Sequence, residues 1–206
     1  SLTTAQVASM ETADVAALSV TQVASMNTAN VAALTTSQVQ ALTTAQVRGL
    51  TSSQLNSLTT AQVASMETAD VAALSVTQVA SMNTANVAAL TTSQVQALSS
   101  AQVAGLTTTQ IGALETSDLS AMSASQLAGL SAAQIGRLTT AQAAALTTGQ
   151  VAGLSATQVA SLSTAATAAL TTSQVQALTT AQVRGLTNTQ LNSLTTAQVA
   201  SMETAD

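Results

Sequence analysis

The chain has 206 residues, of which 47% are hydrophobic, 5% are charged and none is aromatic, and its net charge at neutral pH is −5. This balance is typical of a folded chain, because disordered chains are poor in apolar residues and rich in charge. Only three residues are basic, which excludes the basic surface that nucleic-acid binding needs. Without His, Cys, Lys or Tyr the chain also lacks the usual bases and nucleophiles, so we expect neither catalysis nor a cofactor.

From Thr3 onward the chain repeats one eight-residue unit, here called the octad, without any change of register. Its consensus is Thr-Thr-Ala-Gln-Val-Ala-Ala-Leu, and we number its positions p1 to p8. Position p8 is Leu or Met in every complete octad. A fixed period predicts a repeat architecture in which each unit packs on its neighbours. We therefore expect residues 1–206 to be a single continuous array and a fragment of a longer repeat region.

In chain order, long blocks of this array are copies of one another. Residues 3–42 recur unchanged at residues 59–98, and residues 35–70 recur at residues 171–206 with two substitutions. The offsets are 56 and 136 residues, which are whole multiples of eight. A unique active site is not expected to occur in duplicate, so these copies favour a function that depends on length or on a repeated surface.

Within one octad the residue types favour a short α-helix. Thr43 and Gln46, at p1 and p4, match the capping box, in which each side chain accepts a hydrogen bond from the backbone of the other residue. Thr35 and Gln38 form the same pair. Leu at p8 and Val at p5 of the next octad have the spacing of a hydrophobic staple. Glycine at p7, as at Gly49, suits the end of a helical turn.

We therefore predict an all-α fold, a solenoid or superhelical coil of very short capped helices with one helix in each octad. A single long helix is excluded because its apolar stripe would rotate by about 80° per octad. A β-solenoid remains the alternative, since Thr and Val favour strands, although p5 and p8 have opposite parity along a strand. Small residues at p3 and p7 are expected to let adjacent turns approach closely. The predicted core spine consists of p5 and p8 residues such as Val7, Met10, Val15, Leu18, Val47 and Leu50.

Some octads depart from the consensus in their polar positions. All acidic residues occur as Glu at p1 with Asp at p4, and the pairs are Glu11 and Asp14, Glu67 and Asp70, Glu115 and Asp118, and Glu203 and Asp206. Two further octads have Asn at both positions. Two oxygen ligands in one octad suggest a weak cation site, for which the first three pairs are the candidates. The favoured interpretation is that carboxylates interact with the helix dipole, and we predict no metal site.

Other departures affect packing. Arg137 is unusual because p7 is otherwise small, and it predicts a break in close packing or an outward-turned corner. The arginines at p6, Arg48 and Arg184, are expected to face solvent. In octad 139–146 Ala143 replaces the p5 Val, and in octad 163–170 Ala166 and Thr167 replace Gln and Val, so we expect these two octads to be the least stable places in the array.

Tandem Leu-Thr-Thr-Ala-Gln-Val, as at residues 42–47 and 194–199, resembles octad arrays in very large bacterial proteins that are often described as adhesin-like or haem-utilisation-like. The resemblance extends over the whole chain and implies a bacterial surface or secreted structural segment, without assigning site residues.

The functional hypothesis is therefore a structural repeat that forms a rigid rod or a self-assembling extracellular fibre, with other copies of itself as partners. We expect no membrane span, because polar residues interrupt every octad, and no small-molecule ligand. One alternative is binding to an ordered surface, such as ice or a polysaccharide, through the threonine pairs at p1 and p2. Others are a passive spacer or stalk in an adhesin and a solenoid that binds a peptide.

Overall fold

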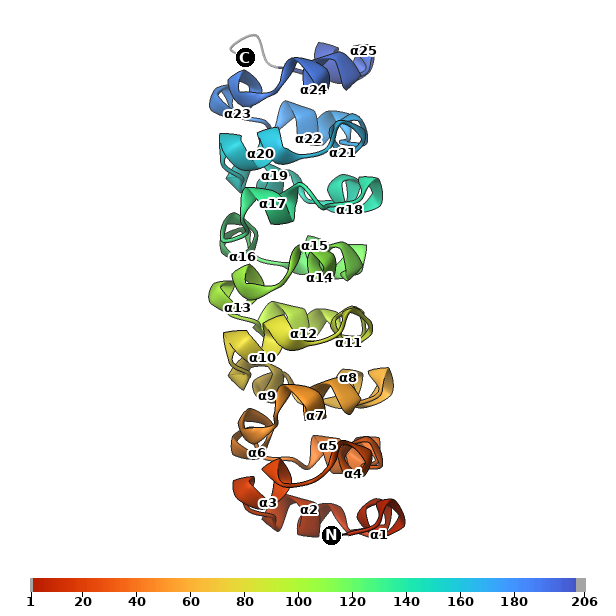
Figure 1. The fold of residues 1–206 in the computed structure, drawn as a ribbon. Coiled ribbons are helices and arrows are strands. Elements are labelled where there is room, and N and C mark those ends of the chain that lie inside the picture. The colour runs from red at the N-terminus through yellow and green to blue at the C-terminus, as the bar shows by residue number, and fades with distance from the viewer. Residues whose placement is uncertain (1, 203–206) are drawn as a thin grey trace. The chain divides into compact units, whose positions relative to one another are not determined.

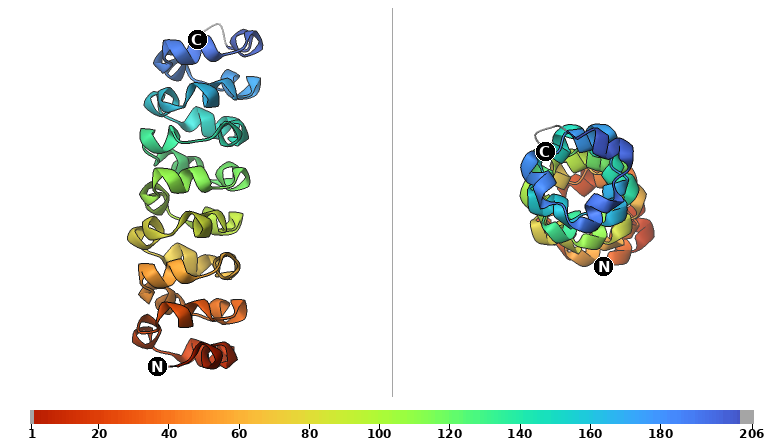
Figure 2. Two further views of the ribbon diagram at one scale, coloured as in Figure 1. Left: turned by 45° about the vertical axis from the view of Figure 1, so that its right-hand side comes forward. Right: turned by 90° about the horizontal axis from the view of Figure 1, so that it is seen from above.

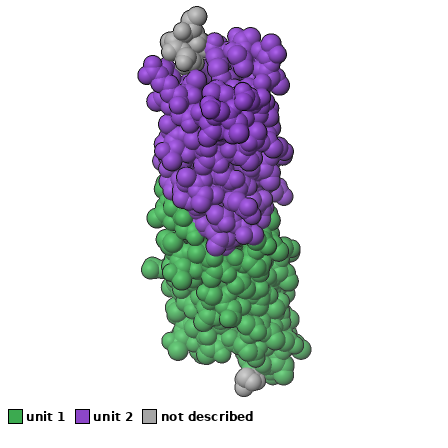
Figure 3. Space-filling model, turned by 45° about the horizontal axis from the view of Figure 1, so that its top comes forward, with its two compact units in different colours: residues 1–105 green, residues 106–206 purple. Residues whose placement is uncertain are grey.

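The computed structural model describes residues 2–202, and within them every complete octad forms one short helix and no strand occurs (Figure 1). This confirms the predicted all-α solenoid and excludes the β-solenoid. The chain divides into two compact units, residues 1–105 and 106–206, which Figure 3 shows in separate colours. In each unit the helices follow one another around an axis (Figure 2).

The helices of the first unit are α1 (Thr4–Ser9), α2 (Thr12–Ala17), α3 (Val20–Ala24), α4 (Thr28–Ala32), α5 (Thr36–Gln40), α6 (Thr44–Gly49), α7 (Ser52–Ser57), α8 (Thr60–Ser65), α9 (Thr68–Ala73), α10 (Val76–Ser81), α11 (Thr84–Ala88), α12 (Thr92–Ala97) and α13 (Ser100–Gly105). Those of the second unit are α14 (Thr108–Ala113), α15 (Thr116–Ala121), α16 (Ala124–Ala128), α17 (Ala132–Ile135), α18 (Thr140–Ala145), α19 (Thr148–Gly153), α20 (Ala156–Ser161), α21 (Thr164–Ala168), α22 (Thr172–Gln176), α23 (Thr180–Gly185), α24 (Asn188–Ser193) and α25 (Thr196–Ala200).

Each helix is short because the chain is extended at p8 and p1. In the octad of α6, Thr43 at p1 has φ −75° and ψ 155°, and Leu50 at p8 has φ −63° and ψ 135°. These values lie in the β region, so the chain leaves the helix and starts a new one within two residues. A helix of six residues is unstable alone, and the coil therefore depends on contacts between turns.

The turns stack with a spacing of three to four octads. Within each unit, helices pack on the helix three octads later, as α3 does on α6 and α20 does on α23. Hydrogen bonds also connect octads that are four apart, because the side chain of Gln46 in α6 reaches the end of α2. One turn of the coil in each unit thus contains between three and four octads, a number that periodicity alone does not give.

The core lies inside the coil and uses positions p4, p5 and p8. Val7, Val15 and Val47 at p5 are almost completely buried, as is Leu50 at p8. Met10 and Leu18 at p8 are only partly buried, because they belong to the first described turn and no earlier turn covers them there. Position p3 is exposed in every described octad, so the prediction that small p3 residues allow close approach of turns was wrong.

The close approach instead involves p2 of one octad and p7 of the octad three later. A Cβ atom added at Gly49 would lie 2.4 Å from Cγ1 of Val20, and one added at Gly105 would lie 2.4 Å from Cγ1 of Val76. Within residues 2–202 no glycine has a positive φ. Gly49 is the last residue of α6, as expected, but it does not adopt the left-handed conformation that glycine often has at a helix end. It is needed instead for space under a valine of the preceding turn.

Candidate functional site

The repeated polar feature of the fold is the capping box at the start of each Gln-containing helix. The amide of Thr43 donates to Oε1 of Gln46 over 2.7 Å, and the amide of Gln46 donates to Oγ1 of Thr43 over 3.3 Å. Thr35 and Gln38 make the same two bonds, at 2.7 and 3.2 Å. Each box satisfies backbone groups that a helix N-terminus otherwise leaves without a partner.

The glutamine at p4 has a second role that sequence reasoning missed. Nε2 of Gln46 donates to the carbonyl oxygens of Val15 and Leu18, over 3.0 and 2.6 Å. These carbonyls lie at the C-terminal end of α2, where a helix leaves its last acceptors unsatisfied. One side chain therefore caps the start of its own helix through Oε1 and the end of another helix, four octads earlier, through Nε2.

We call this row of bonds the glutamine seam. In the first unit it includes Gln38, Gln46, Gln54, Gln62, Gln78, Gln94 and Gln102, and in the second unit Gln134, Gln142, Gln150, Gln158, Gln174, Gln182, Gln190 and Gln198. Their side chains are buried, and Gln46 is 1% exposed. A sequence signal for the seam existed: glutamate serves equally well in a capping box, yet p4 is never Glu. Only an amide has both the acceptor and the N–H donor that the two roles need.

The asparagine octads keep one bond of the capping box and a bond between turns. Oδ1 of Asn83 accepts from the amide of Asn86 over 2.8 Å, and Nδ2 of Asn86 donates to the carbonyl of Leu55 over 3.1 Å. Asn30 likewise donates to the carbonyl of Leu2. An amide at p4 is thus the common requirement, with the longer Gln side chain reaching more acceptors.

Within residues 2–202 the acidic octads have neither a capping box nor an amide donor at p4. Glu11, Glu67 and Glu115 at p1 are exposed and make no side-chain cap hydrogen bond. The p4 carboxyls differ in environment, since Asp14 is exposed whereas Asp70 and Asp118 are 3% and 2% exposed. Within residues 2–202 no three acidic side chains gather into a group that could hold a metal ion. Glu203 and Asp206 lie outside the described residues.

Asp70 has the clearest environment of these carboxyls. Its Oδ1 accepts a hydrogen bond of 2.8 Å from the hydroxyl of Thr44, at p2 of α6. Burial raises the pKa of Asp70 above its ordinary value, the bond from Thr44 opposes that rise, and the neighbouring charge of Glu67 adds to it.

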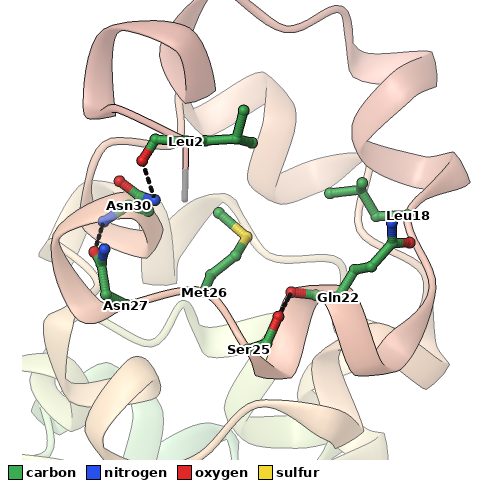
Figure 4. Close-up of a pocket in the computed structure, with 7 residues that line it drawn as sticks. All are labelled: Leu2, Leu18, Gln22, Ser25, Met26, Asn27 and Asn30. Carbon is green, nitrogen blue, oxygen red and sulfur yellow. Dashed lines mark hydrogen bonds between the residues drawn. The ribbon is translucent and has the colours of Figure 1, made fainter.

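One pocket opens in the first turn of the first unit (Figure 4). It has a volume of about 360 Å³, and its lining includes Leu2, Leu18, Gln22 and Met26. Gln22 completes a capping box with Ser19, but within residues 2–202 its amide meets no earlier turn. The pocket thus belongs to the surface on which turns of the coil stack, and we assign no ligand to it.

The departures predicted from packing are visible. Arg137 is exposed and lies after the end of α17, the helix of its octad, which has only 4 residues. Ala143 and Thr167 occupy p5 of α18 and α21 and are buried, and these two helices pack on each other. The two octads with neither Val, Leu nor Ile at p5 thus fall at one contact. No described helix has the length and apolar character needed to cross a membrane.

A family model described as ALTTAQ repeat matches the chain in seven overlapping segments, at residues 7–44, 39–66, 63–100, 91–116, 111–148, 144–180 and 175–204. No curated protein and no solved structure matches the chain.

Proposed function

We propose that this chain, which belongs to the ALTTAQ repeat family, is a structural segment whose length is set by its number of octads. The observation that carries the proposal is the glutamine seam. Buried polar atoms at p4 bind the preceding turn of the same chain in both units, so the interior serves cohesion between turns.

We further propose that the segment is extracellular, at a bacterial surface, and that it self-associates into fibres. The location follows from the resemblance of its octads to those of large adhesin-like proteins. Self-association is supported by the outer surface, where p1 and p3 are exposed in every described octad and are mostly Thr, Ser and Ala. A net charge of −5 over 206 residues provides little repulsion between copies.

The structural role is tested by changing the number of octads. A second copy of residues 3–58 is inserted before residue 59, where the chain itself begins to repeat residues 3–42. This insertion adds seven octads in register. Small-angle X-ray scattering should show that the maximum dimension grows in proportion to the octads added. Growth as about the 0.38 power of chain length, as in a globular domain, would contradict a structural segment of adjustable length.

Cryo-electron microscopy of the purified chain tests self-association separately. Ordered filaments or sheets would support an assembling fibre. Separate particles at all concentrations would contradict assembly and favour a spacer or stalk.

Binding to an ordered surface has less support. The p1 hydroxyl of each Thr-Gln capping box already accepts a backbone amide, as that of Thr43 does, so one hydroxyl of each threonine pair is engaged. Thermal hysteresis in a concentrated solution would be needed to support ice binding.

A further inference from the structure

The buried carboxyl of Asp70 interrupts the glutamine seam. Its sequence neighbours in the seam, Gln62 and Gln78, donate from Nε2 to the carbonyls of Leu34 and Leu50 in the turn before. A carboxylate has no N–H to donate. Asp70 instead accepts from the hydroxyl of Thr44, which belongs to the helix three octads earlier.

The register of the seam identifies the acceptors that face position 70. A glutamine of the seam donates to residues 28, 30 or 31 positions earlier, which for Asp70 are Leu42, Gln40 and Val39 at the end of α5. A helix C-terminus carries partial negative charge on its last carbonyl groups. An ionised carboxyl at this place is therefore unfavourable, whereas a neutral carboxylic acid has an O–H that can donate to them.

The charged groups around Asp70 are few. On its own helix, Glu67 at the N-cap is exposed and acidic. The helices packed on α9 are α6 and α12, of which α6 carries the exposed Arg48 and α12 carries no titratable residue. The helices that the register of the seam pairs with this octad are α5 and α13, and they also carry no titratable residue.

We propose that Asp70 makes the contact between α5 and α9 dependent on protonation. In acid the neutral carboxyl donates to the carbonyls at the end of α5 and closes the seam, and at higher pH the carboxylate leaves that contact weak. Acid thus strengthens this contact between two turns of the array. Proteins whose carboxylates are paired in the folded state usually behave in the opposite way and unfold in acid.

The sign follows from proton linkage. The pKa of Asp70 is raised in the folded chain, so the folded state binds the proton more tightly than the unfolded state does. This contribution to stability is complete below the unfolded pKa. It decreases as pH rises from the pKa of Asp70 in the unfolded chain to its pKa in the folded chain. Above both values the carboxyl is ionised in both states, and the contribution is lost.

The test compares Asp70→Asn with Asp14→Asn. Residues 11–18 and 67–74 are identical, but Asp14 is exposed and Asp70 is buried, so the two variants make the same chemical change in two environments. Asn at p4 also has a natural precedent in Asn86, which keeps an inter-turn bond. Unfolding by guanidinium chloride is followed by far-UV circular dichroism at a series of pH values from 3 to 8.

Relative to Asp70→Asn, the folding equilibrium constant of the unmodified chain should fall by up to about tenfold per pH unit between the unfolded and folded pKa values. Asp14→Asn should follow the unmodified chain. Parallel curves for the unmodified chain and Asp70→Asn would overturn the proposal. A pH dependence that disappears in Glu67→Gln but persists in Asp70→Asn would overturn it too, because the N-cap carboxyl would then be responsible.

Discussion

The contact between Val20 and Gly49 allows a sharp test of how the turns stack. In Gly49→Ala the new Cβ would lie 2.4 Å from Cγ1 of Val20, well inside contact distance. Valine in a helix has little rotational freedom at χ1, so the clash must be relieved by moving one turn against the other. Overpacking of this kind costs about 1–3 kcal/mol.

Gly153→Ala is the matched control, because Gly153 also occupies p7 at the end of its helix. Its added Cβ would lie 3.7 Å from Cβ of Ala124, which is ordinary contact. Replacing glycine by alanine in a helix favours folding by up to about 1 kcal/mol, and both variants gain this term. Equilibrium unfolding should therefore place Gly49→Ala about 1–3 kcal/mol below Gly153→Ala in free energy of unfolding.

A double variant isolates the contact itself. Val20 is 39% exposed, so Val20→Ala loses little burial, and it should restore most of the stability lost in Gly49→Ala. Equal stability of the two glycine variants, or no coupling between positions 20 and 49 in the double-mutant cycle, would refute the stacking of p2 on p7.

Three further predictions concern the seam, the core and the register. Gln46→Met should lose about 1–3 kcal/mol more free energy of unfolding than Gln6→Met, because both variants lose a capping box but only Gln46→Met also removes the inter-turn donor of the Leu18 carbonyl. Equal losses would contradict the seam. Ala143→Val should raise stability by about 1.6 kcal/mol, for two added carbon atoms at a buried p5 position, and a lower melting temperature would show that the contact with α21 has no room. Deletion of residues 51–58, a whole octad, should leave a cooperative thermal transition. Deletion of residues 51–54 should not, since loss of half an octad places polar residues at p5 and p8. An unchanged melting temperature after the shorter deletion would contradict the octad register.

Much of the local structure could be predicted from the sequence, because the forces that act within one octad are local. Thr43 and Gln46 are three residues apart, and their capping bonds follow from that spacing whatever surrounds them. The alternation of cap and apolar residue then requires one short helix per octad. The burial of p5 also follows, since p5 carries the bulkiest apolar residue inside most helices.

The tertiary structure alone decided which octads meet, because that depends on the small rotation between successive helices and not on any single residue. The stacking of octads three and four apart places Gly49 beneath Val20 and joins the amide of Gln46 to the end of α2. It also buries Asp70, while Asp14 in the identical octad stays exposed. Residues 11–18 and 67–74 have the same sequence, so no reading of the octad by itself could distinguish their carboxyls. The difference arises because a preceding turn covers one of them, and burial is a property of the neighbours in space.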